Sequence, residues 1–124
     1  MSLKDEMDFE LRHVDGETET DAVLFALSTC GWCKQTRMYL EMEEISYDYV
    51  YVDLTQGEER EKILAVLEKY NPDQSFPTLV LNDGKDVILG FEEEEIEAAV
   101  ARAWTAWETY MMTSKKKQIK LVIT

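Results

Sequence analysis

Cysteine and histidine are scarce in this sequence, which has two cysteines and one histidine among 124 residues. Two thiols cannot complete a four-thiolate zinc site, and His13 is distant from both cysteines, so we expect no structural zinc site within one chain. No apolar run approaches the roughly 18–20 residues that a membrane span needs. The N-terminus also lacks the basic flank and apolar stretch of a secretory signal. We therefore expect a cytoplasmic protein without membrane contacts.

Basic side chains are also few: the sequence has 13 against 26 acidic ones, and four of the 13 lie in the last ten residues. Residues 1–114 consequently carry a formal charge of −17. Such a surface repels a phosphate backbone, so nucleic-acid binding is not expected. The acidic body is either a solubilising field with a basic tail beside it or a docking surface for a basic partner.

Hydrophobic patterning gives the order of the predicted elements. Alternation at Met7, Phe9 and Leu11 indicates a half-buried strand that ends at Asp15-Gly16. Buried or alternating strands are predicted at 22–27, 47–52, 78–81 and 86–89, with a hairpin turn at Asp83-Gly84. Helices are predicted over 34–44, from a capping box at 55–58 to residue 70, and from Glu92 with an apolar face formed by Ile96, Val100, Trp104, Trp107 and Met111.

This order predicts an α/β fold with a mixed four-stranded sheet and helices on both faces. Residues 22–112 form the expected domain. Residues 1–21 are an N-terminal extension with a possible strand, and 113–124 are a basic tail with another. These two terminal strands are candidates to pair with each other. Met1-Ser2-Leu3 resembles a cloning remnant, so we expect no structural role for it. The single domain is expected to be a monomer.

The two cysteines, Cys30 and Cys33, lie where the buried strand turns into a helix. The first cysteine there meets unpaired backbone N–H groups and the positive end of the helix dipole, which favour a thiolate. The second lies one turn inside the helix and is close enough to form a disulfide. Cys30 is thus the predicted nucleophile and Cys33 the resolving thiol. Such a pair supports disulfide exchange.

Four neighbours of the thiols are candidates for supporting roles. Lys34 and Arg37 either add local positive charge or are simply solvated helix residues. Gly31 permits a tight turn and the close approach of a partner backbone. Trp32 is either an exposed aromatic that packs on a substrate or a lid over the helix end.

With these motifs in place, the sequence resembles a glutaredoxin of the thioredoxin-fold superfamily over about residues 22–107. The resemblance rests on Cys30-Gly31-Trp32-Cys33, on Ser75-Phe76-Pro77-Thr78 and on Gly90-Phe91. It implies a thioredoxin-like fold and disulfide-containing protein substrates or glutathione mixed disulfides. It further implies that Pro77 is cis and faces the thiols, that Phe76 offers its backbone to the substrate, and that Gly90 and Phe91 line the same site.

Two departures bear on the reductant. Glutathione-using members carry Lys three residues before the first cysteine, where this chain has Leu27. They also carry a Gly-Gly step before an acidic pair, where this chain has Gly90-Phe91-Glu92-Glu93. The Gly-Phe step is closer to the glutaredoxin-like electron donors of ribonucleotide reductase, which thioredoxin reductase recharges. The resemblance thus leaves glutathione, as a co-substrate, and thioredoxin reductase as alternatives, with no bound cofactor.

Two other functions are compatible with the sequence. Some glutaredoxins with Gly after the first cysteine hold a [2Fe–2S] cluster between two subunits, with Cys30 of each chain and glutathione as ligands. Gly31 favours this hypothesis, and Leu27 weakens it because glutathione must bind. The last alternative is an adaptor whose terminal strands bind a partner through an exposed edge, with the cysteines incidental.

Overall fold

The computed structural model describes residues 3–112, and the surroundings of side chains as far as Ala103. Its core is a five-stranded mixed sheet of order β1-β3-β2-β4-β5, in which only β2 and β3 run parallel. The strands are β1 (Arg12–Val14), β2 (Val23–Ala26), β3 (Tyr47–Tyr51), β4 (Thr78–Leu81) and β5 (Asp86–Leu89). The helices are η1 (Leu3–Glu6), α1 (Gly31–Met42), η2 (Val52–Leu54), α2 (Gly57–Tyr70) and α3 (Glu93–Met112).

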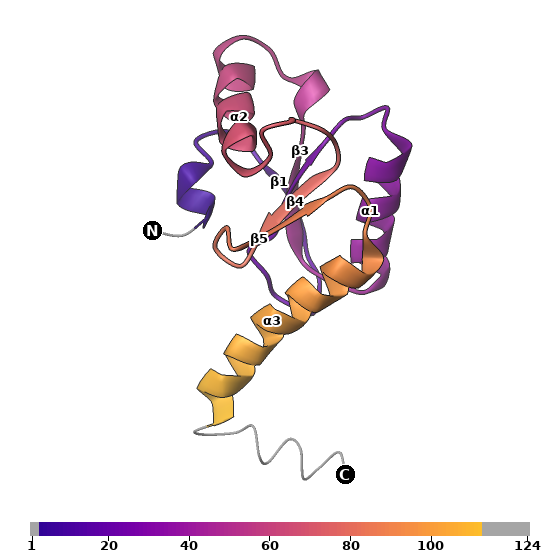
Figure 1. The fold of residues 1–124 in the computed structure, drawn as a ribbon, viewed down its shortest axis with the longest axis vertical. Coiled ribbons are helices and arrows are strands. Elements are labelled where there is room, and N and C mark those ends of the chain that lie inside the picture. The colour runs from indigo at the N-terminus through magenta and orange to yellow at the C-terminus, as the bar shows by residue number, and fades with distance from the viewer. Residues whose placement is uncertain (1–2, 113–124) are drawn as a thin grey trace.

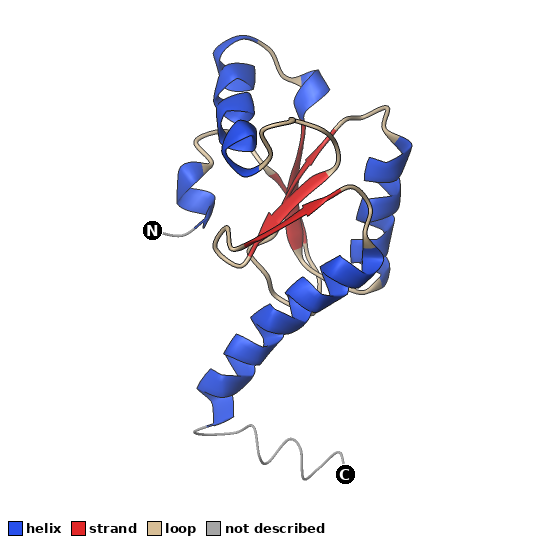
Figure 2. Ribbon diagram, viewed as in Figure 1, coloured by secondary structure: helices blue, strands red, loops and turns tan. Residues whose placement is uncertain are grey.

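The predicted helices do cover both faces of the sheet (Figures 1 and 2). The central strand β2 is fully buried, as its continuous apolar run predicts. Because side chains alternate along a strand, Leu24 packs in a core with residues of α1 and α3, such as Leu40 and Ile96. Phe25 packs on the opposite side, in a core that includes Ile63 of α2.

The four predicted central strands and the hairpin are confirmed. Asn82, Asp83 and Gly84 form the turn with φ values of 56°, 58° and 85°, which Asn, Asp and Gly tolerate best. The capping box at 55–58 is wrong. Gln56 precedes α2 and makes no side-chain cap, while the Thr55 hydroxyl donates to the Val52 carbonyl at 2.7 Å. The hydroxyl is therefore engaged with the preceding turn.

The N-terminal segment differs from the prediction. Residues 7–11 form no strand; β1 begins at Arg12 and pairs antiparallel with β3. Leu3, for which the sequence predicts no structural role, is fully buried and packs with Met7 in the α2-side core. Because Leu3 and Met7 are buried against this core, the segment follows the core first and joins the sheet at Arg12. The predicted strand in 113–124 and the side chains of Trp104, Trp107 and Met111 lie outside the described residues.

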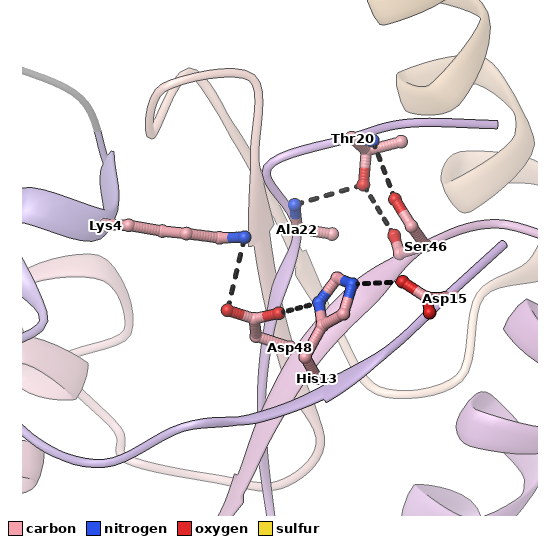
Figure 3. A network of polar contacts seen from close by, with 7 residues as sticks. All are labelled: Lys4, His13, Asp15, Thr20, Ala22, Ser46 and Asp48. Atoms are coloured by element: carbon pink, nitrogen blue, oxygen red, sulfur yellow. Dashed lines mark hydrogen bonds and ion pairs between the residues drawn. The ribbon is translucent and has the colours of Figure 1, made fainter.

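A polar network joins the N-terminal segment to the amino end of β3 (Figure 3). His13 contacts two carboxylates: its Nδ1 lies 2.5 Å from Asp48 and its Nε2 lies 2.8 Å from Asp15. Lys4 Nζ also lies 3.2 Å from Asp48. Asp48 pairs with Val23 in the sheet register, so the network lies at the strand ends opposite to the end where β2 leads into α1.

The loop before β2 lies tightly against the turn that follows α1. Thr18 N–H donates to the Glu44 carbonyl and Ser46 N–H donates to the Thr18 carbonyl, both at 2.9 Å. The Thr20 hydroxyl donates to the Ser46 carbonyl at 2.8 Å. A Cβ on Gly16 would lie 2.5 Å from the Glu44 carbonyl oxygen, so only glycine fits this approach.

Candidate active site

The two thiols lie at the junction of β2 and α1, as the sequence predicts. Cys30 is the N-cap of α1, and its Sγ accepts a hydrogen bond from the Cys33 N–H at 3.1 Å. Its own N–H donates to the Leu27 carbonyl at 3.2 Å, and its carbonyl accepts from the Lys34 N–H at 3.1 Å. The first turn of the helix thus directs a backbone N–H donor at the Cys30 sulfur.

The second thiol has a different environment. Cys33 is 1% exposed, whereas Cys30 is partly exposed, and both are free thiols. Burial raises the pKa of Cys33 to about 12, and its hydrogen bond with Cys30 contributes to the rise. The Cys30 sulfur is partly exposed and accepts a backbone N–H, whereas the Cys33 thiol is buried with a raised pKa, so the two sulfurs are suited to different steps of thiol exchange.

The loop before Cys30 is held by a residue that sequence reasoning missed. The Asp53 carboxylate of η2 accepts hydrogen bonds from the Ser28 N–H at 2.8 Å and from the Ser28 hydroxyl at 2.5 Å. These bonds lower the pKa of Asp53, the hydroxyl bond most strongly. The Asp53 carbonyl in turn accepts from Arg60 at 3.1 Å. Since 25 residues separate Ser28 from Asp53, no local pattern in the sequence indicates the pair.

Three aromatic side chains, of which Trp32 is exposed while Tyr39 and Phe91 are half-buried, form a group between α1 and the start of α3. Trp32 is 65% exposed, and its ring stacks on Phe91 with centroids 6.2 Å apart. Tyr39 also contacts Phe91, edge to face, with the ring centroids 6.1 Å apart. The structure thus brings the predicted residues Trp32 and Phe91 together and adds Tyr39. Its spacing of seven residues from Trp32, two helical turns, is the signal that could have found it.

The proline motif lies at the start of β4. The Phe76–Pro77 peptide bond is cis, as the resemblance implied. Pro77 is buried, whereas Phe76 is half-buried and packs against both hydrophobic cores. The Gly90 N–H donates to the Pro77 carbonyl at 2.9 Å, which extends the β4–β5 ladder. Gly90 has φ of +82°, a conformation that favours glycine.

Lys34 and Arg37, which were predicted to add positive charge near the thiols, have different surroundings. Lys34 is exposed on α1. Arg37 donates from Nε to the Tyr47 hydroxyl at 2.9 Å and from Nη1 to the Tyr51 hydroxyl at 2.7 Å, and its guanidinium lies 3.9 Å from the centroid of the Tyr49 ring. Arg37 therefore binds α1 to β3. The three tyrosines alternate along β3 and share one face, a signal visible in the sequence.

Gly31 does not have the role expected of it in a tight turn. It is the first residue of α1, it is not among the glycines with positive φ, and a Cβ there would meet nothing within 4 Å. The space beside it is open, so a partner backbone could approach. Within residues 3–112, no group of three or more His, Cys, Asp or Glu side chains could hold a metal ion. The cluster hypothesis stays a prediction, because it needs Cys30 of two chains and an external thiol.

Comparisons with known proteins identify the family. The family model described as Glutaredoxin matches residues 22–87, more than half of the chain. The chain belongs to the glutaredoxin family. A solved glutaredoxin from Methanosarcina mazei Go1 is 38% identical, with a TM-score of 0.66, over 73% of this chain and 86% of that one. This match also confirms the thioredoxin-like fold that the sequence predicts.

Two further relatives agree with this assignment. The methanoredoxin of Methanosarcina acetivorans is 38% identical, with a TM-score of 0.64, over 68% of this chain and 88% of that one. A glutaredoxin-like 8.6 kDa protein of the rubredoxin operon of Clostridium pasteurianum is 29% identical over 64% of this chain and 96% of its own. Among residues 3–112, no helix of this glutaredoxin is long and apolar enough to cross a membrane.

Proposed function

We propose that this glutaredoxin-family protein is a thiol-disulfide oxidoreductase that reduces protein or glutathione mixed disulfides through Cys30 and Cys33. One observation carries the proposal: the Cys30 sulfur accepts a backbone N–H at the start of α1, while the Cys33 thiol is buried with its pKa raised to about 12. The environment of Cys30 supports attack, and that of Cys33 supports retention of a proton until the second step.

The reaction proceeds in two exchanges. The Cys30 thiolate attacks one sulfur of the substrate disulfide, whose S–S bond breaks, and the departing sulfur takes up a proton. Cys33 then loses its proton and attacks the Cys30 sulfur of the mixed disulfide, which releases the second substrate sulfur as a thiol. The substrate gains two electrons and two protons, and the protein retains a Cys30–Cys33 disulfide. An external reductant reopens it.

The test uses reduced protein freed of reductant and mixed with the neutral disulfide of 2-mercaptoethanol, and mass spectrometry follows the products. We expect wild type to release both thiols and to lose the mass of two hydrogen atoms as its disulfide forms. C33S should accumulate a covalent adduct on Cys30, and C30S should show no reduction above the rate of the buffer. Reduction by C30S at the wild-type rate would overturn the mechanism.

The reductant that reopens the disulfide can be identified by comparing two reducing systems directly. Leu27 and the Gly90-Phe91 step support thioredoxin reductase, while membership of the glutaredoxin family supports glutathione. Oxidised protein is therefore offered glutathione with glutathione reductase or thioredoxin reductase alone, and NADPH consumption is followed. Sustained consumption with one system and not with the other assigns the reductant.

A further inference from the structure

The turn that carries Cys30 is held by a carboxylate from a neighbouring element. The Cys30 N–H donates to the Leu27 carbonyl at 3.2 Å and closes the turn between β2 and α1. The central residues of this turn, Ser28 and Thr29, are exposed. Among the residues that the structure describes, the hydrogen bonds that reach these two from another element come from Asp53, whose carboxylate accepts from the Ser28 N–H at 2.8 Å and from the Ser28 hydroxyl at 2.5 Å. The contact between Ser28 and Asp53 is therefore a tether for the turn.

The sheet register brings the two partners of the tether together. Strands β2 and β3 run parallel, with Ala26 beside Tyr51. Ser28 and Asp53 each lie two residues further along the chain, so they meet at the same edge of the sheet. Asp53 is itself held from α2, because its carbonyl accepts from the Arg60 side chain at 3.1 Å. The Ser28 hydroxyl bond most strongly, and the Arg60 charge to a smaller extent, lower the pKa of Asp53, so its carboxylate stays ionised and accepts both bonds.

The two cysteines differ in what fixes their positions. Cys33 lies inside α1 and is buried, so the helix and the core hold it in place. Cys30 precedes the helix as its N-cap, with φ of −92° and ψ of 119°, so its position also depends on the turn. In the tethered turn the Cys30 Sγ accepts the Cys33 N–H at 3.1 Å. Release of Ser28 would let Cys30 move relative to Cys33, and the spacing of two reacting groups decides how fast one attacks the other.

We propose that Asp53 is a positioning residue for the second thiol exchange: by holding Ser28, it keeps Cys30 where Cys33 can attack it. The inference rests on the proposed oxidoreductase function and assigns Asp53 to one of its steps. In that step Cys33 gives up its proton to solvent and forms the bond to the Cys30 sulfur, while the substrate sulfur leaves and takes up a proton. The first exchange joins Cys30 to an external disulfide, so it does not depend on the spacing of the two cysteines.

The charge of Asp53 predicts an effect of the opposite sign. Burial is the main cause that raises the pKa of Cys33, with smaller contributions from Cys30 and from the negative charge of Asp53. Removal of this charge alone would therefore ease the deprotonation of Cys33 and speed the second exchange. Removal of the tether would slow it. A variant that keeps the hydrogen bonds and one that loses them thus distinguish the two effects.

The experiment measures the two exchanges separately. Reduced full-length protein is mixed with the disulfide of 2-mercaptoethanol, and mass spectrometry of acid-quenched samples follows the growth and decay of the adduct on Cys30. Asp53→Ala should slow the decay about tenfold and change the growth by less than about twofold. Asp53→Asn keeps an amide oxygen for the Ser28 N–H and an amide N–H for its hydroxyl, so its adduct should decay at least as fast as that of wild type.

Two further variants test the same contact from the other side and control for charge. Ser28→Ala loses the hydroxyl bond and keeps the N–H bond to Asp53, so its adduct should decay about threefold more slowly than that of wild type. Glu58→Ala removes an exposed carboxylate from the first turn of α2 and changes the net charge as Asp53→Ala does, so it should leave both rates unchanged. Circular dichroism establishes that each variant is folded.

The outcomes separate this proposal from the proposed function. If reduced wild type fails to react with the disulfide, the oxidoreductase function itself is wrong. If wild type reacts and the adduct of Asp53→Ala decays as fast as that of wild type, the function stands and the positioning role is overturned. Equal slowing of both exchanges in Asp53→Ala would also overturn it, because a general loss of structure would then explain the effect. Equal slowing of the decay in Asp53→Asn and Asp53→Ala would overturn it in favour of the charge.

Discussion

The two ends of the sheet are built in different ways. At the amino end of β3, His13, Asp48 and Lys4 are joined by close polar contacts, and the loop around Gly16 leaves no room for a side chain (Figure 3). At the end where β2 leads into α1, Trp32 is exposed and the space beside Gly31 is open. We therefore expect the amino end to be the more stable one, whereas the thiol end keeps an exposed surface.

The largest expected effect is the difference in reactivity between the two cysteine sulfurs at the thiol end. Iodoacetamide reacts with thiolates, and burial, the main cause that raises the pKa of Cys33, persists when Cys30 is replaced by serine. We expect reduced C33S to be labelled at Cys30 at least about 100-fold faster than C30S is labelled at Cys33. Mass spectrometry measures both rates.

The labelling rate of Cys33 should depend on pH in a defined direction. Because the pKa of Cys33 is raised, labelling of C30S should keep increasing with pH beyond the range in which an ordinary thiol reaches its plateau. Unfolding in guanidinium removes the burial and should bring the two variants to similar rates. Similar rates in the folded proteins would show that burial does not protect Cys33.

The second prediction tests the stable end through Leu3. This side chain is fully buried against the α2-side core, so Leu3→Ala should lower the free energy of unfolding by about 2–4 kcal/mol. Leu54, which is 66% exposed near the thiol end, is the matched control: Leu54→Ala should change it by less than about 0.5 kcal/mol. Urea unfolding measures both, and equal effects would remove the contrast between the ends.

Sequence reasoning identified the thiol end because its signals are local. A buried strand followed by a helix placed Cys30 at the helix start, and spacing along one strand or helix could have indicated Tyr39 and the tyrosines around Arg37. The amino end depends on contacts between distant segments. Alternation at Met7, Phe9 and Leu11 is the same whether these residues form a strand or pack under a helix. Their packing against the α2-side core, which the sequence does not reveal, decides between the two conformations.

The other features that the sequence did not predict depend on which strands pair with each other. The three-residue strand β1 exists because β3 offers an edge, and no signal in residues 12–14 specifies that partner. The bond from Ser28 to Asp53 likewise requires β3 to lie beside β2. The cis bond at Pro77 came from family resemblance, since its local sequence alone does not determine the isomer.

The third prediction compares two glycines, one at each end. Gly16→Ala would place a methyl group 2.5–2.6 Å from backbone atoms of residues 44–46, which cannot move aside as a flexible side chain could. We expect a loss of about 1–3 kcal/mol in unfolding free energy. Gly31→Ala meets open space in a helix, so it should be neutral or stabilising by up to about 1 kcal/mol. Equal losses in urea unfolding would contradict the comparison.

The smallest expected effect is the pH dependence of the network around His13. Hydrogen bonds to Asp48 first, and then to Asp15, raise the pKa of His13 above its usual 6.5. The stabilisation is therefore complete below the unfolded pKa and is lost as the pH rises through the higher folded pKa. Since the His13 side chain is half exposed, screening limits the change to a few tenths of a kcal/mol, roughly.

The measurement is urea unfolding of wild type and His13→Gln from slightly acidic to mildly alkaline pH. Wild type should lose its advantage over His13→Gln as the pH rises, because the neutral imidazole binds the two carboxylates more weakly. Arg12→Gln on the same strand is the control: arginine does not titrate in this range, so its difference from wild type should not depend on pH. An advantage of wild type that grows with pH would reverse the assigned sign and show that His13 is held neutral at this end of the sheet.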